Sequence, residues 1–180
     1  MTELSQVEAV KANDLSHLSG EMNIDHNDIN KYLTFFLSDS VYGIGINTVK
    51  EIIEFGVITH VPMTPDYIRG VINLRGKVVP VIDLAERLGK KAAEPTKRTC
   101  NIIVEMMVDD EATDIGFVVD LVNEVIDIPA ELIELAPAFG ADIRVDFIAG
   151  MARLDNKFTV LLDLENVLSI EELSELDGMT

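Results

Sequence analysis

Short apolar runs rich in valine and isoleucine recur along the chain from Tyr32 onward. Turn residues separate them at intervals of about 8 to 12, a spacing typical of small β-barrels and sandwiches. The runs are YLTFFL, VYGIGI, GVITHV, GVINL, KVVPVIDL, NIIVEMM, IGFVVDLV, EVIDI and KFTVLLDL. The pattern therefore predicts a mainly β fold.

Helical patterns are sparse. The clearest lies at the C-terminus, where Ser169 and Glu172 form a capping-box pattern ahead of two leucines. Residues 1–30 are polar and acidic and have no sustained period, so we expect a mobile N-terminal tail. The chain then divides into this tail and one domain over residues 31–180, with short helices and a C-terminal helix.

Two segments of the chain repeat. Residues 67–89 match residues 147–169 at an offset of 80, and residues 42–53 match residues 115–126 at an offset of 73. A period this long with two copies argues against a solenoid and predicts two similar β modules in the same element order. We expect two small barrels side by side, with a groove between them. The identical pairs include Ile68 and Ile148, Gly70 and Gly150, Leu74 and Leu154, Asp83 and Asp163, Gly43 and Gly116, Val49 and Val122, and Glu51 and Glu124.

Each copy carries a tight hairpin turn followed by a helix cap. The turn is Arg75-Gly76 in the first copy and Asp155-Asn156 in the second, and Gly or Asn accepts a positive φ at low cost. The aspartate that ends the next strand is placed to cap a short helix. The two copies are expected to share a fold and to differ in surface, because arginine in one turn is replaced by aspartate in the other.

Composition excludes several classes of protein. Of the 180 residues, 48% are hydrophobic and 26% are charged, which is typical of a folded globule. No stretch approaches the roughly 18 apolar residues of a membrane helix, so we expect a soluble, cytoplasmic protein with no direct membrane insertion. The single cysteine, Cys100, allows no intrachain disulfide and is expected to be a small hydrophobic residue at the start of a strand.

Charge is unevenly distributed. The formal net charge of −18 disfavours nucleic acid and anionic lipid as partners. Residues 69–98 nevertheless hold eight of the fourteen basic residues and sum to +5, whereas the remainder sums to −23. This basic segment is either a solvated face or one side of a protein interface.

The candidates for chemistry all have ordinary structural explanations. Gly43-Ile44-Gly45 is only a fragment of a dinucleotide-binding motif and lies in an expected strand. The three histidines have no metal-binding spacing, and no nucleophile motif is present. We therefore expect no catalytic, cofactor-binding or metal-binding residues, and a protein that acts by recognition rather than as an enzyme.

The order of the motifs points to a family. YLTFFLSDSVYGIGINTVKEII, then VPMTPDYIRGVINLRGKVVPVIDL, then IGFVVDLVNEVIDI and FIAGMARLDNKFTVLLDLENVL resemble the CheW family of chemotaxis coupling proteins from about residue 31 to the C-terminus. The resemblance implies two five-stranded SH3-like β-barrels. It also implies a non-catalytic adaptor that joins the regulatory domain of the histidine kinase CheA to the cytoplasmic tips of methyl-accepting chemotaxis receptors, and so is recruited to membrane receptor arrays.

The resemblance also assigns roles to particular residues. By position, Ile46, Val49 and Glu51 match the receptor-contacting segment of the family, and Ile102 and Ile103 fall near the strand that lines the groove from its other side. The segment that ends in the N-L-R-G motif adds Gly70 and Arg75, which we assign to a partner contact or to the contact between barrels. For Arg75, packing within its own turn is an equal alternative.

Two other functions remain open at this stage. One is a CheW-like adaptor of another chemosensory pathway, such as one that controls twitching motility. The other, which the residues favour less, is a small-barrel enzyme or ligand-binding protein that uses Asp83 and Asp163 as an acid and base.

Overall fold

The computed structural model describes residues 30–135 and 144–168 of the chain. The expected C-terminal helix and all but the last residue of the expected tail lie outside these ranges. Within them the protein is mainly β, as predicted. The strands are β1 (Lys31–Leu37), β2 (Ser40–Gly45), β3 (Val49–Glu54), β4 (Ile68–Leu74), β5 (Lys77–Asp83), β6 (Cys100–Val108), β7 (Glu111–Val119), β8 (Leu121–Asp127), β9 (Ile133–Glu134), β10 (Ile148–Leu154) and β11 (Lys157–Leu162).

The helices in the described ranges are all short. They are η1 (Ile46–Thr48), α3 (Leu84–Arg87), η2 (Ala130–Leu132), η3 (Val145–Phe147) and α4 (Leu164–Val167). Asp83 caps α3 by accepting a hydrogen bond from the backbone N–H of Glu86, and Asp163 caps α4 by accepting from Glu165 and Asn166. The two aspartates therefore have the capping role that the repeat predicted.

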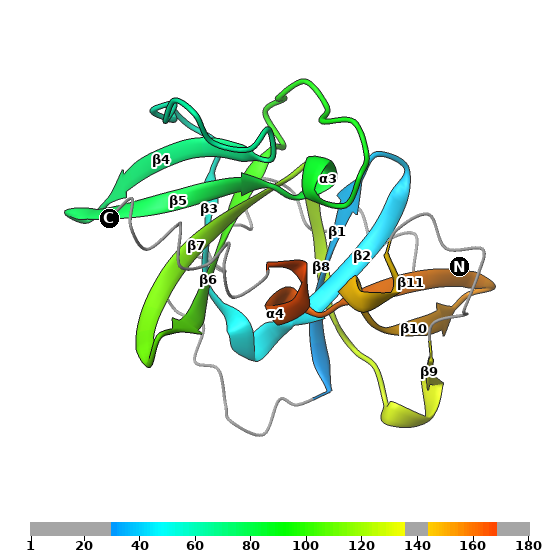
Figure 1. Cartoon of the computed structure of the whole chain (residues 1–180). Coiled ribbons are helices and arrows are strands. Elements are labelled where there is room, and N and C mark those ends of the chain that lie inside the picture. The colour runs from blue at the N-terminus through cyan, green and yellow to red at the C-terminus, as the bar shows by residue number, and fades with distance from the viewer. Residues whose placement is uncertain (1–29, 136–143, 169–180) are drawn as a thin grey trace.

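The strands form two sheets (Figure 1). One has six strands in the order β8-β1-β2-β11-β10-β9, and the other has five in the order β3-β6-β7-β5-β4. Backbone pairing closes neither sheet into a barrel within the described residues, and the short strand β9 adds a sixth strand to one of them. The predicted two-module β architecture is present, as two sheets of six and five strands.

Each sheet combines strands from both sequence repeats. The chain passes from β2 in the six-stranded sheet to β3 in the five-stranded sheet, and later returns from β7 to β8. The parallel pairs that result have the same register in both sheets, because Val81 pairs with Gly116 and Leu161 pairs with Gly43. The modules are thus equivalent but interlocked, rather than consecutive along the chain.

One hydrophobic core spans both sheets. It includes Leu33 and Phe35 of β1 in one sheet, and Ile102 and Phe117 of β6 and β7 in the other. Side chains of one core therefore occupy the space between the sheets, where the sequence predicted a groove. A smaller cluster of Ile128, Ala152 and Leu161 packs on the other face of the six-stranded sheet.

Arg87 of α3 joins the two halves of the molecule. Its Nε donates a hydrogen bond to the carbonyl oxygen of Val167 in α4 at 2.6 Å. Its guanidinium carbon lies 4.9 Å from the ring centroid of Tyr67 and 5.1 Å from that of Phe147, within the range of cation–π attraction. Tyr67 and Phe147 occupy equivalent positions in the two copies, so one arginine holds both halves together.

Candidate partner-binding site

Glu51 and Arg75 form an ion pair on the five-stranded sheet. Nη1 and Nη2 of Arg75 donate to Oε1 and Oε2 of Glu51, each at 2.8 Å, which is the bidentate geometry that arginine favours with carboxylates. Glu51 lies on β3 and Arg75 in the turn after β4, and these strands are the two edges of the sheet. The pair therefore links the two edges through side chains where no backbone pairing does.

The two partners differ sharply in exposure. The Glu51 side chain is 5% exposed and that of Arg75 is 72% exposed. The hydrogen bond from Arg75 to Glu51, with their Coulomb attraction, raises the pKa of Arg75. A buried carboxylate is costly unless it is paired, so Arg75 satisfies a charge that the fold places inside. Arg75 thus pairs within its own sheet, and a contact of Arg75 with a partner protein stays a prediction.

The other residues assigned to receptor contact are buried. Ile46, Val49 and Ile102 belong to the core between the sheets. Ile103 is also fully buried and lies on the opposite face of β6, beside Gly116 and Val81. Receptor contact by these residues stays a prediction, since in this structure their side chains pack inside the protein.

Near this segment lie two exposed residues, Lys50 and Glu105, together with Asp114, whose side chain is only 10% exposed. The sequence did not single out any of the three. Lys50 lies at a β-bulge between Val49 and Glu51, and its Nζ donates to both carboxylate oxygens of Asp114 at 3.1 and 3.0 Å. Glu105 lies 3.6 Å from the same Nζ. The hydrogen bond to Asp114 is the main cause that raises the pKa of Lys50.

Met107 extends this exposed group along β6. It is 66% exposed and lies on the same face of the strand as Glu105, two residues away. We call Lys50, Glu105, Met107 and Asp114 the Lys50 surface. A bulge leaves no simple mark in a pattern of alternating residues, which is why the sequence did not single out Lys50.

Gly70 has a structural role. Its φ is +143°, and a Cβ built there would lie 2.1 Å from the carbonyl oxygen of Thr59. Thr59 pairs with Val71 through two backbone hydrogen bonds of 2.9 Å, so the segment before β4 lies directly over Gly70. Gly150 is crowded by a side chain instead, because its Cβ would lie 2.5 Å from Cγ2 of Ile133. A partner contact by Gly70 therefore stays a prediction, while its role in chain packing is observed.

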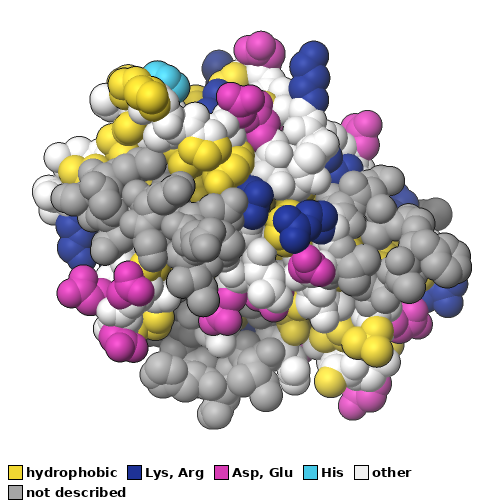
Figure 2. All heavy atoms as spheres, viewed as in Figure 1, with side chains coloured by type: hydrophobic (Ala, Val, Ile, Leu, Met, Phe, Trp, Pro, Cys, Tyr) yellow, Lys and Arg dark blue, Asp and Glu magenta, His cyan; other side chains and the backbone are white. Residues whose placement is uncertain are grey.

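The basic segment is partly neutralised within the chain. Arg69 donates to the buried carboxylate of Asp83 at 2.9 Å, and Arg75 and Arg87 are engaged as described above. Lys91, Lys97 and Arg98 are exposed. Figure 2 shows charged side chains of both signs interspersed with hydrophobic ones on one face of the molecule.

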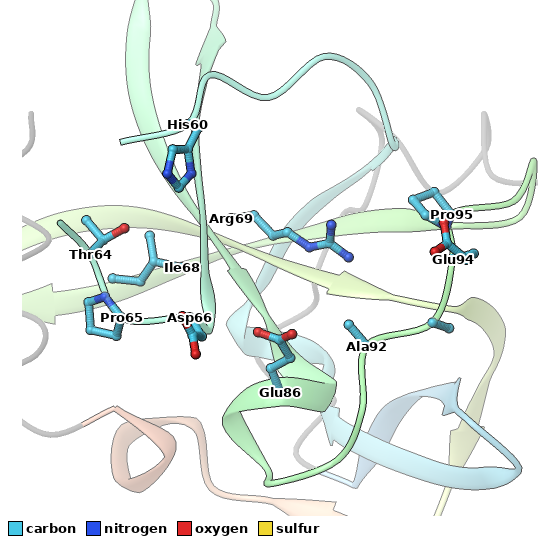
Figure 3. A pocket seen from close by; sticks show the side chains of 11 residues that line it. His60, Thr64, Pro65, Asp66, Ile68, Arg69, Glu86, Ala92, Glu94 and Pro95 are labelled. Atoms are coloured by element: carbon cyan, nitrogen blue, oxygen red, sulfur yellow. The ribbon is translucent and has the colours of Figure 1, made fainter. Parts of the chain in front are cut away.

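A hollow of about 400 Å³ adjoins this segment (Figure 3). Glu86 of α3 points into it, and burial together with the negative charge of Asp83 raises the pKa of Glu86. The residues that line the hollow are His60, Thr64, Pro65, Asp66, Ile68, Arg69, Glu86, Ala92, Ala93, Glu94 and Pro95. Its charged groups have no arrangement that indicates a particular reaction.

Cys100 is buried at the first position of β6, as the sequence predicted. Burial is the main cause that raises its pKa to about 11. Because the thiolate is the reactive form of cysteine, this thiol is poorly suited to nucleophilic chemistry. Among the described helices, none is long and apolar enough to cross a bilayer.

Comparison with known proteins identifies the family. Residues 31–172 match the CheW-like domain. The chemotaxis protein CheW of Klebsiella aerogenes is 34% identical over 149 residues, which cover 83% of this chain and 87% of that protein. The CheW of Bacillus subtilis is 35% identical over 142 residues, or 78% of this chain and 88% of that protein.

A solved structure agrees with these matches. The crystal structure of the scaffolding protein TtCheW from Thermoanaerobacter tengcongensis is similar to this chain with a TM-score of 0.71 and 36% identity. The match covers 81% of this chain and 92% of that one. Sequence, fold and the duplicated hairpins agree, and the chain belongs to the CheW-like domain family.

Proposed function

We propose that this chain is a non-catalytic chemotaxis adaptor that couples the histidine kinase CheA to the cytoplasmic tips of methyl-accepting chemotaxis receptors. The observation that carries the proposal is the match to proteins named chemotaxis protein CheW over most of their length. A role in the cytoplasm, with recruitment to membrane arrays through the receptors, follows from the same proposal.

The architecture is suited to a scaffold. A protein that holds two partners in a fixed relation must not bend between its binding surfaces. One core shared by both sheets, the interlocked strands and the Arg87 contacts all oppose such bending. These features support an adaptor in which the two halves present separate surfaces from one rigid body.

We place the receptor contact over β3 and β6. Glu51 and Ile103 lie on the same face of the sheet as Glu105 and Met107, which are exposed, whereas Ile46, Val49 and Ile102 are buried in the core on the other face. Receptor contact by Ile46, Val49, Glu51, Ile102 and Ile103 is part of the proposal. Met107 offers an apolar anchor, while Lys50 and Glu105 offer exposed charges that set register, and Asp114 holds the Lys50 ammonium in place. A helical receptor hairpin has the alternating apolar and charged positions that such a surface fits.

Binding measurements with purified partners test this proposal. Calorimetric titration of the chain with the regulatory domain of CheA and with a receptor cytoplasmic fragment is expected to give saturable binding to each. Met107→Asp is expected to weaken receptor binding and to leave kinase binding unchanged, because it places a charge on the apolar anchor.

Lys157→Glu is the control, since Lys157 is exposed and lies on β11 of the six-stranded sheet, which contains neither β3 nor β6. If Met107→Asp lost affinity equally for the kinase domain and the receptor fragment, with an unchanged melting temperature, the two partners would not bind separate surfaces of the chain. Absence of binding to either partner by the unmodified chain would contradict the adaptor function itself.

A further inference from the structure

The end of the β6–β7 hairpin is strongly acidic. Residues 105–114 contain five acidic residues and no lysine or arginine. Asp109 and Asp110 form the turn, with φ values of 50° and 65°, and both are exposed. This end of the five-stranded sheet therefore attracts a basic partner and repels an acidic one.

The register of the hairpin sets two carboxylates against each other. Glu105 of β6 lies directly opposite Asp114 of β7, and like charges in such a pair repel. β6 lies between β3 and β7 in the sheet, and Lys50 of β3 reaches across it to bind Asp114. Two carboxylates thus share one ammonium, which leaves one negative charge uncompensated.

The two carboxylates do not share the ammonium equally. Asp114, whose side chain is 10% exposed, accepts hydrogen bonds from Nζ of Lys50 at 3.1 and 3.0 Å. Oε2 of Glu105 lies 3.6 Å from the same Nζ, too far for a hydrogen bond, and the Glu105 side chain is 51% exposed. Asp114 therefore holds the Lys50 ammonium, and Glu105 keeps a negative charge that a partner can reach.

Met107 adds an apolar contact beside that charge. It is 66% exposed and lies two residues from Glu105 on the same face of β6, about 6.7 Å farther along the strand. In an α-helix, residues i and i+4 share a face and are about 6 Å apart along the axis. One face of a helix can therefore meet Glu105 and Met107 together.

The receptor is the partner that fits this spacing and charge. The proposed receptor contact already covers β3 and β6, and the receptor tip is the helical partner in the proposed complex. A second copy of this chain is a poor occupant, since each copy has a formal net charge of −18 and two copies repel.

We propose that Glu105 forms an ion pair with a lysine or arginine of a receptor helix, and that Met107 packs against an apolar residue four positions from it. Asp114 is then a positioning residue, because it keeps Lys50 from neutralising Glu105 without contacting the receptor itself. This inference rests on the proposed function and names the receptor chemistry that the site selects.

The first test removes the charge of Glu105. The wild-type chain, Glu105→Gln and Glu111→Gln are titrated with the receptor cytoplasmic fragment and with the regulatory domain of CheA. Glu111 is the matched control, because it is exposed on the same hairpin but pairs with Val108 and so lies on the opposite face. We expect Glu105→Gln to bind the receptor fragment roughly three- to fivefold more weakly, with Glu111→Gln and all kinase affinities unchanged.

The second test examines the positioning role of Asp114. In Asp114→Asn the Lys50 ammonium is no longer held by an opposite charge and pairs with Glu105, so receptor binding is expected to weaken about as much as in Glu105→Gln. Adding Lys50→Met removes that ammonium and is expected to return the affinity to within about twofold of wild type. If Asp114 had only a structural role, both variants would have lower melting temperatures and unchanged receptor affinity.

The third test identifies the receptor residue. Each lysine and arginine of the receptor tip is replaced by glutamate, one at a time, and each product is titrated with Glu105→Lys. One of these charge reversals is expected to restore the binding that Glu105→Lys loses. If none does, Glu105 does not face a basic residue and the proposal is wrong.

Unchanged receptor affinity in Glu105→Gln, or an equal loss in Glu111→Gln, would overturn the inference and leave the adaptor function intact. A loss confined to the kinase domain would do the same. Failure of the wild-type chain to bind the receptor fragment would instead overturn the proposed function, and with it the partner assigned to this site.

Discussion

Arginine and aspartate stand at the same place in two hairpin turns of nearly equal φ, and of the two only Arg75 is in an ion pair among the described residues. The backbone does not require either residue, because Arg75 and Asp155 share the same left-handed conformation. What Arg75 adds is a bidentate partner for a carboxylate that is 5% exposed. The side chain at this position of the turn can therefore differ between the two copies while the backbone conformation stays the same.

Removing Arg75 is expected to destabilise the protein. Arg75→Met leaves Glu51 as a buried, unpaired carboxylate, so its melting temperature is expected to fall. Adding Glu51→Gln removes the charge and is expected to restore part of the loss. Arg98→Met is the matched control, since Arg98 is exposed and its side chain is in no described ion pair. Equal melting temperatures for Arg75→Met and Arg98→Met would contradict the role given to the pair.

The raised pKa of Glu124 predicts how the stability of the protein changes with pH. Burial raises its pKa in the folded state, so the folded protein holds this proton to a higher pH than the unfolded chain does. The contribution of protonated Glu124 to the free energy of unfolding is fully present below the ordinary carboxyl pKa of about 4.3. It is lost as the pH rises through the pKa of Glu124 in the folded protein.

Glu124→Gln cannot ionise, so its stability relative to wild type is expected to rise between about pH 4 and pH 7. Urea unfolding at both pH values measures this difference, with the exposed Glu111→Gln as the control. A relative stability of Glu124→Gln that falls with pH would have the wrong sign for a buried carboxyl.

At the scale of elements, each of the two β-hairpins has a glycine where another segment of the chain packs so closely that a side chain would not fit. The segment before β4 passes over Gly70, and β9 passes over Gly150, at equivalent points of the two copies. A glycine is required there because of close approach, whereas Gly76 is required only by the turn.

Alanine substitutions separate these two requirements. Gly70→Ala introduces both a strained φ and a clash with backbone, effects that each cost about 1–3 kcal/mol. Gly76→Ala meets no atom within 4 Å and involves the φ alone, so it is expected to cost less. Denaturant unfolding gives both values. A smaller loss for Gly70→Ala than for Gly76→Ala would show that the crossing is not tight.

The local elements were predictable because their signals are local. The hairpin turn at Arg75-Gly76, the caps at Asp83 and Asp163 and the strand character of β5 and β11 all follow from residues a few positions apart. The sequence did not show that β2 of the first copy pairs with β11 of the second, or that β7 of the second copy pairs with β5 of the first. Pairing between strands far apart in the chain leaves no periodic pattern in a single sequence.

The assignment of Ile46, Val49, Glu51, Ile102 and Ile103 to receptor contact stays a prediction, and the sequence did not indicate that all five are buried. Alternation over VKEI indicated a half-exposed strand, yet the bulge at Lys50 sets Val49 opposite Val104 and Glu51 opposite Ile103, so both are buried, on opposite faces of the strand. The Glu51–Arg75 pair joins residues 24 positions apart on opposite edges of a sheet. Without the topology, neither the partner of Arg75 nor the exposed Lys50 surface could be identified.

At the scale of the whole molecule, the interlocked sheets are expected to unfold as one unit. The core contains side chains of both sheets, and Arg87 contacts groups from both halves. Calorimetry is expected to give one transition with equal calorimetric and van't Hoff enthalpies. Arg87→Met is expected to lower the melting temperature without splitting the transition. Two separate transitions in the wild-type protein would contradict a shared core.

The rigid body matters because an adaptor must transmit the state of one partner to the other. Membership of the CheW-like family is consistent with a scaffold, and in the adaptor function proposed above the two partners are the kinase and the receptor. Binding alone would not establish coupling, since two proteins can share a scaffold without influencing each other.

The most direct test is the autophosphorylation rate of purified CheA with a receptor cytoplasmic fragment, measured with and without this chain. We expect the receptor fragment to change the kinase rate only when the chain is present, and Met107→Asp to weaken that control. A kinase rate that responds to the receptor equally well without the chain, or that ignores the receptor when the chain is present, would contradict the adaptor function.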